Sequence, residues 1–221
     1  MLRGLFVTGT DTGIGKTVTC AALLHRYRQV LPLRYWKPVQ TGIEQDDDTA
    51  EVRRLGVCRD DEVFAEGIRL PRPVSPHLAA RWSGRTIAIE ELTGWTGPGA
   101  DAARWIVEGA GGALVPLNDS ALMTDLMQAL ALPVLVVARS GLGTINHTLL
   151  TLEALRARSL RIAGVVMAGD KDAENRAAIE HYGDVAVVGE MPNFQPLDAG
   201  ALGEWACAEL DPQARLLDLL Q

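Results

Sequence analysis

The first residues able to do chemistry lie between Gly9 and Thr17, directly after a short apolar run, Leu5-Phe6-Val7. Gly9 and Gly15 enclose five residues, and Lys16-Thr17 follow where a helical pattern begins. A strand that turns through glycines into a helix directs backbone N–H groups and the positive helix end at one point, where a polyphosphate binds. We therefore predict a phosphate-binding loop in which Lys16 reaches the outer phosphates and the Thr17 hydroxyl holds Mg²⁺.

The loop is a variant of the usual phosphate-binding pattern. Its spacing is one residue longer than G-x-x-x-x-G-K-[ST]. The alternative is a glycine-rich turn that only starts a helix, and the order of strand, Lys-Thr pair and helix disfavours it. The loop residues that we expect to bind a nucleotide are Thr12, Gly13, Ile14, Gly15, Lys16 and Thr17.

Charged residues also mark two other predicted strand ends. Lys37 is placed near the same rim as Lys16, and two converging ammonium groups suit an anionic reaction centre, whereas a lone strand-end lysine is usually solvated. The acidic run Glu44-Gln45-Asp46-Asp47-Asp48 is either a solvated loop or a source of the carboxylate oxygens that Mg²⁺ requires. Glu108 ends a third strand, where nucleotide-hydrolysing enzymes place a second acid for the metal.

Short apolar runs alternate with helical patterns along the chain. The predicted strands are Gly4–Thr8, Arg34–Val39, Trp105–Glu108, Pro133–Arg139, Ile162–Met167 and Val185–Gly189. The predicted helices are Lys16–Val30, Met123–Leu130, Asn146–Arg158 and Ala173–Tyr182. Continuous apolar strands are typical of a parallel sheet covered on both faces. We expect one domain over residues 1–221, a three-layer, doubly wound, mostly parallel α/β fold like that of P-loop nucleotide hydrolases, with its site at the carboxyl ends of the strands.

One stretch has no clear periodicity. Glu66–Asp101 carries Pro71, Pro73, Pro76 and Pro98 with several glycines. We expect an excursion folded over the sheet edge, of a length that usually carries function or disorder. Within it, Ser75-Pro76 is typical of a helix start, with Ser75 as N-cap.

Composition limits the classes of partner. The 221 residues are 48% hydrophobic and carry a formal charge of −7, which disfavours nucleic acid and anionic membranes as partners. The longest apolar stretch is too short to span a bilayer, and the early phosphate loop leaves no room for a signal peptide. The three cysteines, Cys20, Cys58 and Cys207, show no paired spacing. We expect a cytoplasmic enzyme with buried, free thiols.

Five segments, taken in order, resemble one family. The segments are Gly9-Thr10-Asp11-Thr12 with Lys16-Thr17, Lys37-Pro38-Val39-Gln40-Thr41-Gly42, Ser75-Pro76-His77, Val107-Glu108-Gly109-Ala110-Gly111-Gly112, and Gly143-Thr144-Ile145-Asn146-His147. Each motif alone is weak, but the ordered set is specific and resembles the dethiobiotin synthetase family, with a looser likeness up to Gly189-Glu190-Met191-Pro192. The resemblance implies a homodimeric, ATP- and Mg²⁺-dependent ligase of biotin synthesis. Such an enzyme closes a cyclic urea on 7,8-diaminopelargonate with CO₂, through a carbamate and a carbamic-phosphoric anhydride.

The resemblance also implies roles for single residues. Lys16 and Lys37 are catalytic, and Thr17, Asp48 and Glu108 hold Mg²⁺, although alignment leaves Asp46 and Asp47 open. The implied substrate contacts are Thr12, Lys37, Thr41, Pro76, Gly111, Gly143, Thr144, Ile145 and Asn146, the last four reaching a carboxylate of the substrate across the dimer interface. The implied nucleotide contacts outside the loop are Glu108, Gly169, Pro192 and Asn193. Whether His77 touches substrate is left open.

The alternative from another class is a nucleotide-driven switch, such as the chromosome-partitioning and cell-division-site ATPases. Those proteins carry a lysine near the start of the phosphate loop, where this chain has Thr10-Asp11. They also tend to carry a basic surface or a terminal membrane helix, and the acidic C-terminal segment here is neither. We therefore favour the ligase.

The sequence predicts weak selection of the nucleotide base. Many family members place an asparagine after the fifth strand, where this chain has Ala168-Gly169-Asp170. Asn193 in the loop Pro192-Asn193-Phe194 could replace it if that loop folds inward, but without a polar reader of the base the site discriminates poorly. We expect CTP, GTP and UTP to support turnover within about tenfold of ATP, as compared by kcat/KM at saturating diamine and bicarbonate. A preference for ATP above about a hundredfold would show that other contacts read adenine.

Overall fold

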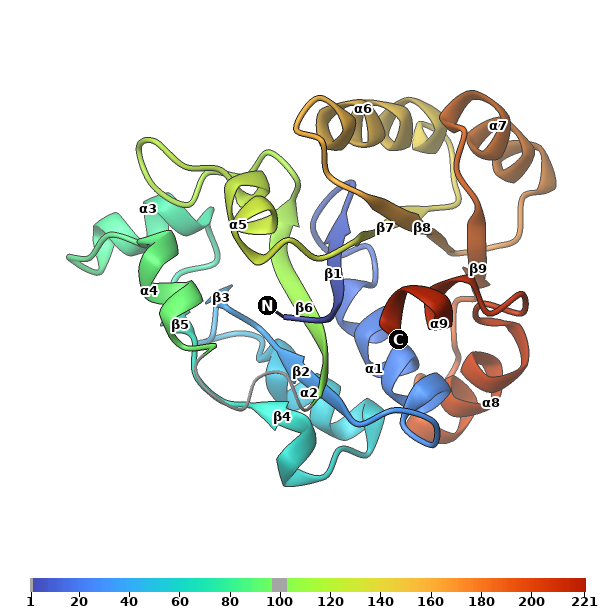
Figure 1. Ribbon diagram of the computed structural model, residues 1–221, viewed down its shortest axis with the longest axis horizontal. Coiled ribbons are helices and arrows are strands. Elements are labelled where there is room, and N and C mark those ends of the chain that lie inside the picture. Colours follow the sequence, from blue (N-terminus) through green and yellow to red (C-terminus); the bar gives the residue numbers. More distant parts are fainter. Residues whose placement is uncertain (1, 97–102) are drawn as a thin grey trace.

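The computed structural model describes residues 2–96 and 103–221, and a seven-stranded sheet runs through its middle (Figure 1). The strands are β1 (Gly4–Gly9), β2 (Leu33–Trp36), β4 (Val63–Phe64), β6 (Arg104–Gly112), β7 (Val134–Arg139), β8 (Ile162–Ala168) and β9 (Val187–Met191). Their spatial order is β4-β2-β6-β1-β7-β8-β9, and each adjacent pair is parallel.

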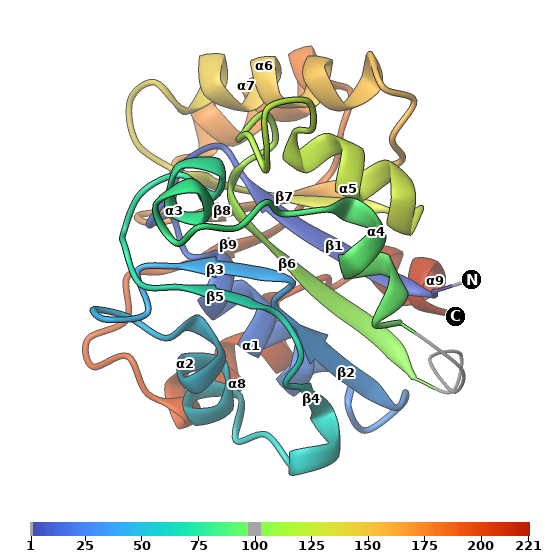
Figure 2. The ribbon, with the colours of Figure 1, turned by 90° about the vertical axis from the view of Figure 1, so that its left-hand side faces the viewer.

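Helices cover both faces of this sheet (Figure 2). The face shared by Leu5 and Val7 is covered by α1 (Lys16–Tyr27), α2 (Asp48–Gly56), α8 (Ala199–Glu209) and α9 (Arg215–Leu220). The face of Phe6 is covered by α3 (Pro76–Trp82), α4 (Ile89–Gly94), α5 (Met123–Leu130), α6 (Thr144–Arg156) and α7 (Ala173–Gly183). The predicted three-layer, doubly wound fold is confirmed.

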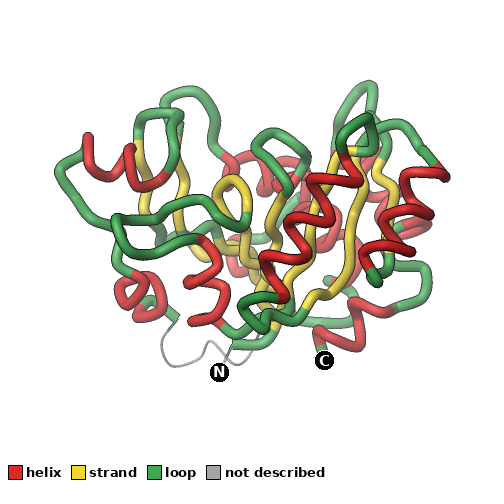
Figure 3. The backbone as a smooth tube through the Cα atoms, turned by 90° about the horizontal axis from the view of Figure 1, so that it is seen from above, coloured by secondary structure: helices red, strands yellow, loops and turns green. Residues whose placement is uncertain are grey.

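The strands are buried on both faces, as continuous apolar runs require. In β7, residues 134–138 are all buried, because α1 and α6 lie on opposite sides of it. Both termini lie at one end of the sheet (Figure 3), next to the start of β1. The loop after β1 therefore lies at the opposite end, where the parallel strands have their carboxyl ends.

The predicted strand Arg34–Val39 is wrong as a single element. The sheet strand β2 ends at Trp36, and Val39–Thr41 form a separate strand, β3, which pairs with β5 (Ile68–Leu70) in a two-stranded sheet. Pro38 lies at the break and has no N–H for a ladder, while its carbonyl accepts the amide of Ile68 at 2.8 Å. The break places Lys37 just beyond the carboxyl end of β2, where the main sheet ends.

The stretch Glu66–Asp101 is more regular than expected, although residues 97–101 lie outside the described residues. It contributes β5, α3 and α4, and α3 packs against β3. α3 begins with Ser75 as N-cap and Pro76 in its first turn, as predicted, but the Ser75 side chain makes no capping hydrogen bond within the described part of the chain. This segment builds a wall over the carboxyl end of β6.

Several boundaries differ from the predictions. Met123–Leu130 is correct, whereas α1 ends three residues early, α6 starts at Thr144 and β9 ends at Met191. The sequence analysis missed α2, α8, α9, β4 and the 3₁₀ turn Asp60–Glu62. Only Cys20 of the three free cysteines is fully buried, and Cys207 is exposed, so the expectation of buried thiols was wrong there. Among the helices described, none combines the length and apolarity that crossing a bilayer requires.

Candidate active site

The phosphate-binding loop joins β1 to α1 and holds its lysine against its own backbone. Gly15 precedes α1 with φ at 96°, in the left-handed region that favours glycine. A Cβ on Gly15 would lie 2.7 Å from Cε of Met191. The Nζ of Lys16 donates to the carbonyl oxygen of Asp11 at 2.9 Å. A bound phosphate can take the place of that carbonyl as the partner of Lys16.

The side chain of Asp11 ties the loop to the end of β7. Its carboxylate accepts the amide of Thr12 at 2.7 Å and pairs with Nη2 of Arg139 at 2.7 Å. Both side chains are about half exposed, so water screens the pair. Its main effect is to hold the loop in position.

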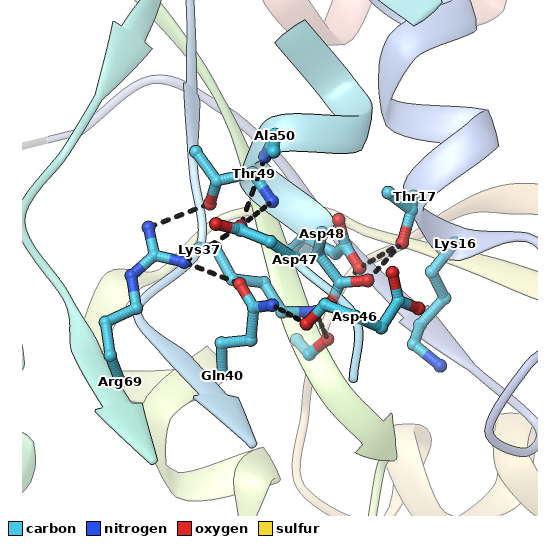
Figure 4. Close-up of polar contacts among 12 residues, drawn as sticks. Lys16, Thr17, Lys37, Gln40, Asp46, Asp47, Asp48, Thr49, Ala50 and Arg69 are labelled. Atoms are coloured by element: carbon cyan, nitrogen blue, oxygen red, sulfur yellow. Dashed lines mark hydrogen bonds and ion pairs between the residues drawn. The ribbon is translucent and has the colours of Figure 1, made fainter. Parts of the chain in front are cut away.

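Three oxygen-bearing side chains meet beside the loop, and they come from three elements. Thr17 lies in α1, Asp48 starts α2, and Glu108 lies in β6. The Oγ1 of Thr17 is 3.0 Å from Oδ1 of Asp48 and 3.0 Å from Oε1 of Glu108 (Figure 4 shows Thr17 and Asp48). Hydroxyl and carboxylate oxygens are the ligands that Mg²⁺ prefers, so this donor set fits the predicted metal.

Lys37 extends from the break after β2 into the same cluster. Its Nζ lies 2.6 Å from Oδ2 of Asp48 and 2.6 Å from Oε1 of Glu108, and it donates to the carbonyl of Gly109 at 3.1 Å. Its side chain is only 3% exposed. Each proton of this buried ammonium therefore has an acceptor.

Burial and charge oppose each other in the titration of this cluster. Burial lowers the pKa of Lys16, and the neighbouring Lys37 lowers it further. Burial also lowers the pKa of Lys37, but Glu108 and Asp48 outweigh it and hold this pKa above its usual value. The pKa of Asp48 is raised by burial and lowered more by Lys37, so it falls below its usual range. An incoming anion would therefore stabilise the charged form of Lys16 more than that of Lys37, which already has two carboxylate partners.

The structure separates the three aspartates of the acidic run. Asp48 faces Thr17 and Lys37, as described above. Asp47 instead caps α2, with its Oδ1 accepting the amides of Thr49 at 3.0 Å and Ala50 at 3.1 Å. Asp46 lines the main cleft. A cap residue ahead of a short helix was the sequence signal for α2 that the analysis missed.

A buried glutamine and an arginine hold the acidic run in place (Figure 4). The Oε1 of Gln40 accepts Nη1 of Arg69 at 2.6 Å, and its Nε2 donates to the carbonyl of Asp46 at 2.9 Å. Nη2 of Arg69 donates to Oγ1 of Thr49 at 2.9 Å. The sequence analysis gave neither Gln40 nor Arg69 a role, because their contact depends on the pairing of β3 with β5.

A cleft of 720 Å³ opens beside these groups. Its walls come from the phosphate loop, the acidic run, the end of β6 and the turn before α3. The predicted substrate residues that line it are Thr12, Lys37, Thr41, Pro76 and Gly111. Its lining includes Ser75 and, among the described residues, stops short of His77. The amide of His77 donates to the carbonyl of Pro116 at 3.2 Å.

A second cavity, of 470 Å³, shares Gly13 and Gly15 with the main cleft. Of the predicted nucleotide residues, Ile14, Pro192 and Asn193 line it. In the described structure Gly169 lies outside its wall, and its amide donates to the carbonyl of Met191 at 2.8 Å. The phosphate loop therefore separates two cavities, which suits a ligand with phosphates between a base and a reacting group.

The second predicted anion site lies at the start of α6. Gly143 caps the helix with φ at 92°, and the first helical bond runs from the amide of His147 to Gly143 at 3.1 Å. The amides of Ile145 and Asn146 precede that bond and belong to the positive helix end. In the described structure none of the residues 143–146 lines either cavity. Their role stays a prediction.

A family model described as an AAA domain matches residues 3–201. The chain is 48% identical over 198 residues to the ATP-dependent dethiobiotin synthetase BioD of Paramagnetospirillum magneticum, with 90% of each chain covered. It is 45% identical over 193 residues to the protein of the same name from Brucella ovis, with 87% of each chain covered.

Similar solved structures share the fold at low identity. A MinC:MinD cell division protein complex from Aquifex aeolicus matches with a TM-score of 0.59 at 15% identity, over 98% of this chain and 96% of that one. A ParA family ATPase from Chlorobium tepidum matches with a TM-score of 0.55 at 11% identity, over 99% and 96%. These likenesses support the P-loop architecture alone.

The geometry predicts that the adjacent aspartates are not equivalent. Asp48→Asn removes a charged ligand and should weaken the binding of Mn²⁺, used in place of Mg²⁺, to the ADP-bound protein by about tenfold or more. Asp47→Asn is the matched control, because asparagine caps a helix as well as aspartate does. Free Mn²⁺ is measured by electron paramagnetic resonance. An equal loss in both variants would contradict the assignment to Asp48.

Proposed function

The chain belongs to the dethiobiotin synthetase family, and we propose that it makes dethiobiotin from 7,8-diaminopelargonate, CO₂ and ATP in biotin biosynthesis. One observation carries the proposal at this site: Lys16 and Lys37 converge with the Thr17, Asp48 and Glu108 cluster on one cleft. The proposal treats residues 1–221 as one catalytic domain acting in the cytoplasm. The formal charge of −7 supports small molecules, rather than nucleic acid or a membrane, as its ligands.

The reaction has three chemical steps. One amine of the diamine adds to CO₂ and loses a proton, which gives a carbamate anion. A carbamate oxygen attacks the γ-phosphorus of ATP, ADP leaves, and a carbamic-phosphoric anhydride forms. The second amine attacks the carbonyl carbon of the anhydride, inorganic phosphate and a proton leave, and the cyclic urea closes. The middle step brings two anions together, so repulsion is its main obstacle.

The two lysines oppose that repulsion from different positions. Lys16 lies in the phosphate loop and reaches the outer phosphates once it releases the carbonyl of Asp11. Lys37 follows the end of β2 and lines the same cleft, as do Thr41 and Gly111. We assign Lys37 to the carbamate and the γ-phosphate, where a preorganised charge stabilises the transition state without proton transfer.

Thr17, Asp48 and Glu108 would hold Mg²⁺ beside the loop. The metal when bound supplies positive charge to the phosphate oxygens. These ligands come from α1, α2 and β6, so the site requires the sheet and both helices to be packed. Lys37 contacts both carboxylates, and it would share them with the metal.

The remaining cleft residues would hold the diamine. Thr12 and Thr41 offer hydroxyls near the lysines, and Pro76 and Gly111 narrow the space around them. Ring closure is intramolecular, so holding the two nitrogens in place can supply several kcal/mol of the lowering of the barrier, on the order of that seen for oriented reactants. The cavity lined by Ile14, Pro192 and Asn193 would take the nucleoside.

We further propose a homodimer in which residues 143–146 complete the site of the partner subunit. The amides at the start of α6 would bind the distal carboxylate of the diamine. Support comes from Leu142, next to Gly143, which is 102% exposed, and from Leu150 in α6, which is 56% exposed. In the proposed dimer the partner subunit would cover these two side chains.

The first test of the function removes the second lysine. Lys37→Gln should lower dethiobiotin formation from diamine, bicarbonate and ATP by about a hundredfold or more, because one preorganised charge is lost. Binding of ATP should change little, whereas Lys16→Ala should lose both activity and binding. Product is measured by mass spectrometry and binding by calorimetry.

Lys171→Gln is the matched control for this change. The chain has three lysines, and Lys171 pairs with Glu209 at 2.7 Å on the surface. Its loss should leave turnover unchanged. Near-normal product formation by Lys37→Gln at saturating substrates would overturn the role of Lys37. ATP turnover by the wild type that requires diamine and bicarbonate separates the ligase from a switch, whereas basal hydrolysis alone does not.

Mixing two variants tests whether subunits share sites. Asn146→Glu places like charge beside the carboxylate site of the partner, and Lys16→Ala disables the phosphate loop of its own subunit. In a mixed dimer, one of the two sites combines two intact halves. Random exchange makes half of the dimers mixed, so activity at low diamine should recover to about a quarter of the wild type. Self-contained sites would show no recovery.

A further inference from the structure

A buried tyrosine hydroxyl contacts the carboxylate of Glu108, a proposed metal ligand, from within the core. Tyr35 lies in β2 and is fully buried. Its hydroxyl donates to Oε2 of Glu108 at 2.8 Å. Tyr35 is absent from the lining of the main cleft as described, so it has no contact with substrate there.

The strand register produces this contact. In β2 and β6, Tyr35 pairs with Ile106 and Trp36 pairs with Val107. Tyr35 shares the sheet face of its partner Ile106, and Glu108, two residues further along β6, lies on the same face, which packs against α1. A tyrosine at this position spans the diagonal to a carboxylate two residues further along the neighbouring strand.

The hydrogen bond divides the two oxygens of Glu108 between separate partners. Oε1 lies 3.0 Å from Oγ1 of Thr17 and 2.6 Å from Nζ of Lys37. Oε2 accepts the Tyr35 hydroxyl. The Glu108 side chain is 1% exposed, so water does not replace a lost donor easily. Rotation of the carboxylate would break bonds on both sides.

We propose that Tyr35 is a positioning residue for Glu108: by holding Oε2, it keeps Oε1 directed at Thr17 and the metal. The inference rests on the proposed function, in which Glu108 binds Mg²⁺. Hydrogen bonds to a metal ligand orient it, and their loss typically weakens metal binding or activity by about 10- to 100-fold.

Tyr27 provides a matched control for the hydroxyl. Its side chain is also buried, and its hydroxyl donates to a buried carboxylate, Oδ2 of Asp211, at 2.5 Å. This pair joins α1 to the segment before α9, where Asp211 also accepts the amides of Arg215 and Leu216. Tyr27→Phe and Tyr35→Phe therefore each remove one hydrogen bond from a tyrosine hydroxyl to a buried carboxylate. Only the carboxylate that contacts Tyr35 is a proposed metal ligand.

The experiment measures Mn²⁺ binding to the ADP-bound protein by electron paramagnetic resonance. Tyr35→Phe should raise the Kd for Mn²⁺ about tenfold and lower kcat by a similar factor. Its Kd for ADP without metal should stay within about twofold of the wild type, because Tyr35 lines neither cavity in the described structure and its hydroxyl contacts Glu108. Tyr27→Phe should lower the thermal midpoint and leave both Kd values unchanged.

A double-mutant cycle shows whether the effect passes through Glu108. Added to Glu108→Gln, Tyr35→Phe should change Mn²⁺ affinity by less than about twofold, because the group that it positions is gone. A Tyr35→Phe protein with wild-type Mn²⁺ affinity and a lowered midpoint would overturn the proposal and leave Tyr35 a packing residue. If Glu108→Gln itself kept wild-type Mn²⁺ affinity, the proposed metal site would fail instead.

Discussion

The site depends on the burial of Lys37 between Asp48 and Glu108. An ammonium that is 3% exposed loses its water, and an uncompensated buried charge costs on the order of several kcal/mol. Two carboxylates and a carbonyl offset that cost, and the oxygen of each must lie within about 3 Å of Nζ of Lys37. The surrounding elements bring these groups together.

Each partner of Lys37 comes from a different part of the chain. The break at Pro38 ends β2 so that the lysine reaches the sheet edge, and β6 continues past Glu108 to Gly112. Asp48 is held at the start of α2 by the cap from Asp47 and by the bonds among Gln40, Arg69 and Thr49. The small β3–β5 sheet therefore serves the acidic run and the cleft wall.

The fold alone does not define this chemistry. The same architecture is shared with a MinD complex and a ParA family ATPase at identities of 15% and 11%. In this chain the charged groups of the site lie at the strand ends, where Lys37 and Glu108 contact each other beside the phosphate loop. Tyr35 shows that the layer beneath those ends also matters, because a group without access to the cleft contacts a residue within it.

The sequence by itself determined the parts that are local. The phosphate loop follows from the order of glycines, lysine and helix within Gly9–Thr17, and the doubly wound sheet follows from alternating apolar runs. Tertiary structure decided which of the three adjacent aspartates faces Thr17, because that contact joins α2 to α1 across 31 residues of the chain. It also decided that Arg34–Val39 divides between two sheets, and that Tyr35 meets Glu108. Those outcomes depend on strand register and packing between segments 22 to 73 residues apart, and single-chain periodicity carries no information about register across such distances.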